Sequence, residues 1–256
     1  MNEPFGDDLV ERAERCMLGA AANLGRVSLD GEVAEEEGLI LVSTGMPSVL
    51  LNSAHVTAIP DDAAAVIDRT RRFFAGLDVP WRLWARGPIA EAMRPAAAAG
   101  ALVPLPPQTI MLLSDLGDYS PEAPPGVSVD VVRDPEGLLV FQETFASAVN
   151  LPLSSVSRVF SSGLLDLPEA TALVAASEGT PAGVALAFGL HGVAYLMALG
   201  TLPHSRRRGL GSYLAWRAVL EHREACDTAM ALGGRAYAVY EDMGFREAVD
   251  YAMWAP

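Results

Sequence analysis

The sequence predicts an α/β (α+β) fold in which helices flank a mixed, largely antiparallel central sheet. Three apolar runs at 170–176, 182–190 and 193–201 are separated only by short turn segments, a pattern that favours an antiparallel meander. Apolar residues cover most of a predicted helix at 210–225, as expected for a helix that lies against a sheet. A strand, a helix and a closing strand or hairpin are predicted after it, at 228–232, 234–243 and 245–254.

The first half of the chain also alternates between predicted helices and strands. Asp61 is the expected N-cap of a helix that closes near Gly76, because a carboxylate at that position accepts from free backbone amides. The other elements expected in this half are helices at 8–24 and 89–99 and strands at 39–43, 81–85 and 109–113. In the second half, a strand edge at 127–132 and helices at 136–149 and 153–161 precede the meander.

Residues 115–125 are interpreted as a linker between two domains. Few apolar side chains in and around this segment could join a core, and turn-forming or acidic residues dominate it, as in Asp115, Asp118, Pro121, Pro124, Pro125 and Gly126. The sequence therefore predicts an α/β domain at 1–114 and a second domain at 126–256.

Composition excludes several classes of function. The net charge of -14 argues against a general affinity for nucleic acid or anionic membranes, because phosphates require a basic surface. No apolar stretch approaches the roughly 18 residues of a membrane span, and the acidic start differs from a signal peptide, so a cytoplasmic protein is expected. The two cysteines have no metal-ligand spacing around them, and no metal is expected. All 18 basic residues are arginines, a bias typical of a GC-rich bacterial genome.

A basic, glycine-containing loop lies between the last strand of the meander and the following helix. Backbone amides at a helix start have no partner within the helix, and the helix dipole adds positive charge there. Glycines at such a start permit close approach of a ligand, so the loop predicts an anionic ligand such as a pyrophosphate. Its residues are Arg206, Arg207, Arg208, Gly209, Leu210, Gly211 and Ser212.

Two motifs in this order resemble the GNAT (GCN5-related N-acetyltransferase) superfamily. Arg206-x-x-Gly209-x-Gly211 is similar to its acetyl-CoA pyrophosphate loop, and the segment from Ala236 to Phe245 resembles its Ala-x-x-x-Tyr-x-x-x-Gly-Phe pattern. The resemblance covers roughly residues 126–256. It implies a GNAT fold, acetyl-CoA as cosubstrate and N-acetyltransferase activity. The first half lacks the loop motif and is interpreted as a degenerate GNAT-like domain in a tandem arrangement.

The resemblance also implies roles for individual residues. Leu199, Gly200 and Thr201 would offer backbone groups to the pantetheine arm of CoA. Tyr240 would protonate the departing thiolate, because a phenol with a pKa of about 10 is protonated at neutral pH. Where many members carry an asparagine seven residues before this tyrosine, the chain has Gly233, which leaves the anchoring of that loop open.

Direct attack on the thioester requires a neutral amine, so a base or a water chain must take its proton. The sequence does not identify that base, and the candidates by residue type are Glu143, Glu178, His191 and His204.

The expected acceptor is the amine of a small molecule or peptide, and a homodimer is an assembly that the sequence allows. The alternatives are a catalytically inactive acyl-CoA-binding protein for sensing or assembly and, ranked lowest, another diphosphate-binding protein. Residues 126–256 alone are expected to retain CoA affinity.

Overall fold

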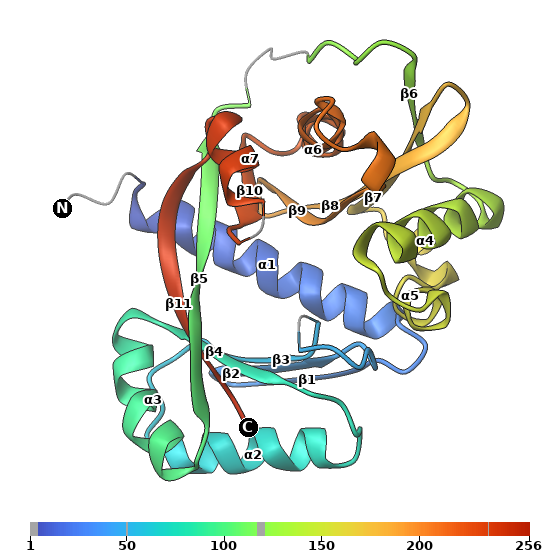
Figure 1. Ribbon diagram of the computed structural model, residues 1–256. Coiled ribbons are helices and arrows are strands. Elements are labelled where there is room, and N and C mark those ends of the chain that lie inside the picture. Colours follow the sequence, from blue (N-terminus) through green and yellow to red (C-terminus); the bar gives the residue numbers. More distant parts are fainter. Residues whose placement is uncertain (1–4, 50, 117–120, 235) are drawn as a thin grey trace.

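The computed structural model describes residues 5–49, 51–116, 121–234 and 236–256. Within these residues, one eleven-stranded sheet runs through both halves of the chain in the order β1-β2-β3-β4-β11-β5-β10-β9-β8-β7-β6 (Figure 1). Most neighbouring strands are antiparallel, whereas β3 with β4 and β9 with β10 are parallel pairs. The predicted mixed, largely antiparallel sheet flanked by helices is confirmed.

The strands are β1 (Glu32–Glu36), β2 (Leu39–Ser43), β3 (Ser53–Val56), β4 (Arg82–Arg86), β5 (Val103–Ser114), β6 (Val127–Val131), β7 (Ala170–Ser177), β8 (Thr180–Leu190), β9 (Val193–Thr201), β10 (Thr228–Leu232) and β11 (Arg246–Ala255). The helices are α1 (Asp7–Val27), α2 (Ala63–Ala75), α3 (Gly87–Ala99), α4 (Pro135–Val149), α5 (Leu153–Val159), α6 (Leu210–Leu220) and α7 (Tyr237–Asp242), with the 3-10 turns η1 (Ser162–Asp166) and η2 (Pro203–Ser205). In the part of the chain described, none of these helices is long and apolar enough to cross a membrane.

The two halves repeat one order of elements. In the first half, the antiparallel run β1-β2-β3 is followed by α2, by β4 parallel to β3, by α3 and by β5. In the second half, β7-β8-β9 is followed by α6, by β10 parallel to β9, by α7 and by β11. This repetition is the arrangement expected of a tandem protein.

The last strands of the two halves are exchanged. Strand β5 ends the first half but pairs with β10, and β11 ends the second half but pairs with β4. The two exchanged strands also pair with each other and run side by side through the middle of the molecule (Figure 1). The sheet is therefore continuous across the predicted linker. Residues 117–120 of that linker lie outside the described residues, and the domain boundary stays a prediction.

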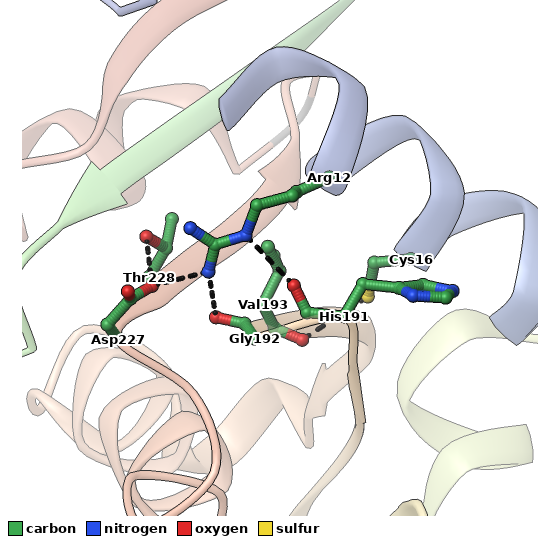
Figure 2. Close-up of polar contacts among 7 residues, drawn as sticks. All are labelled: Arg12, Cys16, His191, Gly192, Val193, Asp227 and Thr228. Carbon is green, nitrogen blue, oxygen red and sulfur yellow. Dashed lines mark hydrogen bonds and ion pairs between the residues drawn. The ribbon is translucent and has the colours of Figure 1, made fainter. Parts of the chain in front are cut away.

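Helix α1 fastens the first half to the second. Its Arg12 guanidinium donates to the carbonyl oxygens of His191 at 3.0 Å and Gly192 at 3.1 Å, both in the turn between β8 and β9. The same guanidinium forms an ion pair with Asp227 at 2.8 Å, directly before β10. Figure 2 shows Arg12 extending from α1 to the β8–β9 turn and to Asp227. The helix is thus part of the packing of the second half.

Hydrophobic side chains form three buried groups. One lies between α1, α4 and α5 and the face of β8 and β9 nearest them, and includes Phe141, Phe160 and Phe188. A second packs α6 and α7 on the opposite face of the same strands. The third packs α2 and α3 against the first half of the sheet. Helices therefore cover both faces of the sheet in the second half.

Several predicted elements differ in their ends. Asp62, not Asp61, is the N-cap of α2, because its carboxylate accepts from the Ala65 amide at 3.0 Å and the helix begins at residue 63. Helix α6 ends at Leu220 rather than near residue 225, because consecutive turns such as that from His222 N–H to the Val219 carbonyl oxygen replace the helix. Strands β1 and β3 were not predicted.

Strand β5 is longer than the predicted 109–113 and contains three prolines, Pro104, Pro106 and Pro107. Proline lacks an N–H and is tolerated where one edge of a strand is unpaired. The prolines lie in the segment that pairs with β11 only, whereas β10 pairs from Ile110 onward. The extra length lets β5 bridge the two halves.

Candidate active site

The predicted anion-binding loop surrounds an uncapped start of α6. Gly209 is the N-cap, has a φ of 77° and provides no side-chain cap. This left-handed conformation suits glycine, and Arg207 beside it also has a positive φ of 58°. A Cβ atom at Gly209 would have no described atom within 4 Å, and one at Gly211 would be 3.6 Å from Thr201 Oγ1. The space beside these two glycines is therefore open, so an anion can approach the start of α6.

The three arginines of the loop do not play the same part. The Arg206 guanidinium donates to the carbonyl oxygens of Thr201 and Ala148, each at 3.0 Å. It therefore ties the end of β9 to the carboxyl end of α4. Arg207 and Arg208 are exposed next to the helix start, and they are the loop cations placed to attract an anion from solvent.

Strand β9 separates from β10 before it reaches this loop. The parallel pairing runs from Val193 to Leu196 only, although β9 continues to Thr201 along β8. Met197 is an extra residue in β9 relative to β8 at the point where the pairing with β10 stops, and such a bulge bends a strand. The edge of β9 around Leu199 is therefore free of a strand partner. Binding of the pantetheine arm by Leu199, Gly200 and Thr201 stays a prediction that this geometry accommodates.

Gly233, which replaces the asparagine of many relatives, is anchored by the first half. Its N–H donates to the Thr109 carbonyl oxygen at 2.8 Å, and its carbonyl oxygen accepts from the side chain of Gln108. Both partners belong to β5. The anchoring that the sequence left open thus comes from the exchanged strand. Arg235, two residues further on, lies outside the described residues.

Tyr240 lies in α7 with 6% of its surface exposed, and its ring centroid is 5.6 Å from that of Phe245. Burial raises the pKa of Tyr240 to about 12, so the phenol keeps its proton at neutral pH and can donate it. The hydroxyl of Tyr237 instead donates to Glu247 at 2.9 Å. The predicted proton donor is therefore the buried tyrosine of the pair, and its catalytic role stays a prediction.

A cavity of about 330 Å³ lies between the two halves. Leu199 of β9 and Gly233 after β10 line it, so the cavity reaches the place where these strands separate. Apolar side chains from α1, α4 and the segment after α5 form much of its wall, among them Met17, Phe145 and Phe160. At the lower end of the roughly 300–1,000 Å³ found for ligand cavities, this volume suits a small molecule.

A polar wall of the cavity comes from the first half and consists of Ser53 and His55 on β3 and Arg82 and Trp84 on β4. Parallel pairing places Ser53 opposite Arg82 and His55 opposite Trp84. Ser53 Oγ and His55 Nε2 are 2.9 Å apart, and the His55 and Trp84 ring centroids are 5.2 Å apart. The guanidinium carbon of Arg82 lies 4.4 Å from the Trp84 ring centroid, a cation–π contact.

Burial dominates the electrostatics of this polar wall. It lowers the pKa of His55 to about 3, with a smaller contribution from the positive charge of Arg82. Burial also lowers the pKa of Arg82 to about 10, which leaves that side chain charged at neutral pH. The wall therefore combines a neutral imidazole with a buried cation.

The sequence analysis missed all four residues of the polar wall. The available signal was the alternation Trp81-Arg82-Leu83-Trp84-Ala85, which puts an arginine and a tryptophan on one face of a strand.

The four residues proposed as the catalytic base are not part of this wall. Glu143, Glu178, His191 and His204 are exposed, and none is among the described residues that line the cavity. Among the described residues, no group of three or more His, Cys, Asp or Glu side chains could hold a metal ion.

The uncapped helix start, the separated strands and Tyr240 all fall within residues 142–245, which match the family model described as Acetyltransferase (GNAT) family. This stretch is a GNAT-family domain. The GNAT domain includes the whole predicted loop, whereas the polar wall of the cavity lies outside it.

Solved structures extend the likeness to most of the chain. A GCN5-related N-acetyltransferase from Kribbella flavida is similar at a TM-score of 0.69 and 18% identity, with 95% of each chain covered. A tandem GNAT protein from the clavulanic acid biosynthesis pathway is similar at 0.60 and 19% identity, covering 85% of this chain and 78% of its own. A GCN5-related N-acetyltransferase from Sphaerobacter thermophilus is similar at 0.62 and 14% identity, with 93% of each chain covered. At these identities the likeness establishes a GNAT fold. Comparison with curated proteins gave no match.

Proposed function

We propose that the protein transfers an acetyl or other acyl group from acetyl-CoA to an amine acceptor by direct attack. The observation that carries this proposal is the separation of β9 from β10 beyond Leu196. That opening lies between the uncapped start of α6 and the cavity lined by Leu199 and Gly233. A diphosphate at α6 and a pantetheine arm along β9 would bring the thioester to the cavity that holds the acceptor.

The reaction needs few groups from the protein. The neutral amine attacks the thioester carbonyl carbon, a C–N bond forms and the C–S bond breaks. The amine loses a proton to a base or a water chain, and Tyr240 donates a proton to the departing thiolate. Because Tyr240 has a pKa of about 12, it holds that proton until the thiolate develops.

A catalytically inactive acyl-CoA-binding protein is the second candidate, and one observation favours it. No aspartate or glutamate is among the described residues that line the cavity. The histidine there, His55, has a pKa of about 3 and is a weak base. Catalysis would then depend on water to remove the amine proton, whereas acyl-CoA binding would not need any base.

A screen of amines against the purified full chain with acetyl-CoA, reading free thiol, separates the two candidates. We expect thiol release that depends on the amine, with the N-acetylated product identified by mass spectrometry. Incubation without an amine controls for hydrolysis of the thioester. Calorimetric binding of acetyl-CoA without turnover of any amine would support the inactive binder, and lack of both would contradict both candidates.

A further inference from the structure

The polar wall of the cavity presents hydrogen-bond donors to a largely apolar space. Trp84 is 2% exposed and His55 is 4% exposed, and within the described residues neither Trp84 Nε1 nor His55 Nδ1 has a hydrogen-bond partner. An unsatisfied buried donor costs roughly 1–3 kcal/mol, so such atoms in a cavity wall are sites for a ligand. Trp84 Nε1 can only donate.

His55 can act as a second donor. When the Ser53 hydroxyl donates to Nε2, at the observed 2.9 Å, a neutral imidazole carries its proton on Nδ1. The ring is then fixed by Ser53 on one side and by Trp84 beside it. Nδ1 is the nitrogen for which the described part of the chain offers no partner.

The charge in the cavity is positive. Arg82 is 7% exposed and lines the cavity together with Trp84 and His55. No carboxylate residue is among the described lining residues. A protonated amine would therefore find no counter-charge, whereas a neutral amine that also carries a carboxylate matches one guanidinium and neutral donors.

We propose that the acceptor is a small apolar amine that carries a carboxylate, and that this carboxylate binds Arg82, Trp84 Nε1 and His55 Nδ1. The apolar body of the acceptor packs against the side chains from α1, α4 and the segment after α5, and its amine reaches the opening beside Leu199. The acceptor role rests on the proposed function. The carboxylate site does not, because it can be occupied by a molecule that has no amine.

Binding to the full chain tests the site without turnover. The probes are 3-phenylpropanoate and hexanoate, each compared by calorimetry with its neutral primary amide. We expect each acid to bind at least about tenfold more tightly than its amide, because charge-assisted hydrogen bonds to a buried guanidinium are strong. Equal affinity of the acids and their amides, or binding of neither, would overturn the proposal.

Two variants assign the effect to the wall. In Arg82→Gln the preference for the acids should disappear. Trp84→Phe keeps an aromatic ring but removes the N–H together with part of the ring volume. Because the lost volume affects acids and amides alike, the preference for the acids should fall several-fold, so this variant provides the test if Arg82→Gln fails to fold. Exposed Arg94→Gln is the matched control and should leave the preference intact. Unchanged acid binding in folded Trp84→Phe and Arg82→Gln would refute the assignment.

Turnover separates this inference from the proposed function. Acetylation of phenylalanine should be at least about tenfold more efficient in kcat/KM than that of 2-phenylethylamine, which lacks the carboxylate. Equal turnover of both amines would leave the acyltransferase standing and overturn the carboxylate site. Acid-selective binding with no acetylation of any amine would uphold the site and contradict the acyltransferase.

Discussion

The two halves share an order of strands and helices but differ at the helix start that would bind an anion. In the first half, Asp62 caps α2 with its own carboxylate. In the second half, the equivalent helix α6 begins at Gly209 and has no side-chain cap. A carboxylate at a helix start satisfies one of the free amides and supplies the negative charge that a diphosphate would otherwise bring. Under the proposed function, the cap residue is therefore one feature that would make α6, and not α2, the place where CoA binds.

The halves also differ in how far their parallel strands stay together. In the first half, β3 pairs with β4 over three of its four residues. In the second half, β9 pairs with β10 over four of its nine residues. Of these two strand pairs, only the β9–β10 pair therefore leaves a long unpaired strand edge. That edge belongs to β9 and is the one that a pantetheine arm would need. The first half instead supplies α1, β5 and the polar wall of the cavity.

The largest effect is expected from separating the halves. Residues 126–256 lack β5, which lies between β10 and β11, and lack α1, which covers β8 and β9. The strand exchange reverses the expectation, drawn from the sequence, that this fragment keeps its CoA affinity. We expect no cooperative thermal unfolding by circular dichroism and no calorimetric CoA binding, either by this fragment or by 1–114.

The control is to express 1–116 and 121–256 together. These two chains contain all eleven strands of the described sheet, so they should associate and recover both cooperative unfolding and CoA binding. A monomeric 126–256 fragment that unfolds cooperatively and binds CoA would show that the second half does not depend on the first.

The next effect concerns the reaction. Tyr240→Phe should lower kcat by about 10²-fold and leave the KM for acetyl-CoA nearly unchanged, because loss of a general acid acts mainly in the transition state. Tyr237→Phe is the matched control, since its hydroxyl is bound to Glu247, and should retain most of the turnover. Equal kcat for the wild type and Tyr240→Phe would make Tyr240 a packing residue.

A smaller effect concerns acid stability through His55. Its pKa falls from 6.5 to about 3 on folding, so between these values the unfolded chain binds a proton that the folded chain excludes. Stability is therefore lost as the pH falls below 6.5, by roughly 1.4 kcal/mol per pH unit from this group. Urea unfolding from about pH 6.5 to pH 5 should show a shallower loss in His55→Gln. Exposed His204→Gln should keep the wild-type slope, and identical slopes for His55→Gln and wild type would be inconsistent with this linkage.

The smallest effect is expected at the cap of the first half. Asp62→Ala should lower the free energy of unfolding by about 1 kcal/mol, because it removes the acceptor of the Ala65 amide. It should leave CoA affinity unchanged, since CoA is expected only at α6. The measurements are urea unfolding and calorimetry. Appearance of a second CoA site in Asp62→Ala would sharpen the comparison, because it would mean that the cap alone blocks the first half.

Most of the features that the sequence predicted are set by patterns of neighbouring residues. The meander, the loop before α6 and the segment around Tyr240 were found because alternation, glycines and helix starts are features of neighbouring residues. Asp62 and Asp61 are adjacent acidic residues, and only the geometry of the helix start distinguishes them.

The features that the sequence could not predict depend on pairing between strands far apart in the chain. The exchange of β5 and β11 depends on strands far apart in the chain, and a β3 of four residues has too little periodicity to detect. The polar wall exists only because β3 and β4 pair in parallel, which joins His55 to Trp84. The anchoring of Gly233 by β5 has the same origin. The candidate site therefore has one part that local motifs predict and another part that exists only through pairing of distant strands.

The account is tested most directly by placing a negative charge at the start of α6. Gly209→Asp places a carboxylate at the helix start, and Gly209→Asn is its uncharged match, because both residues tolerate the left-handed conformation better than other side chains. Calorimetric titration of CoA into the two folded variants should show at least about tenfold weaker binding by Gly209→Asp than by Gly209→Asn, because the negative charge of the carboxylate repels the diphosphate. Equal affinity for CoA in the two variants would contradict binding of the diphosphate at the start of α6.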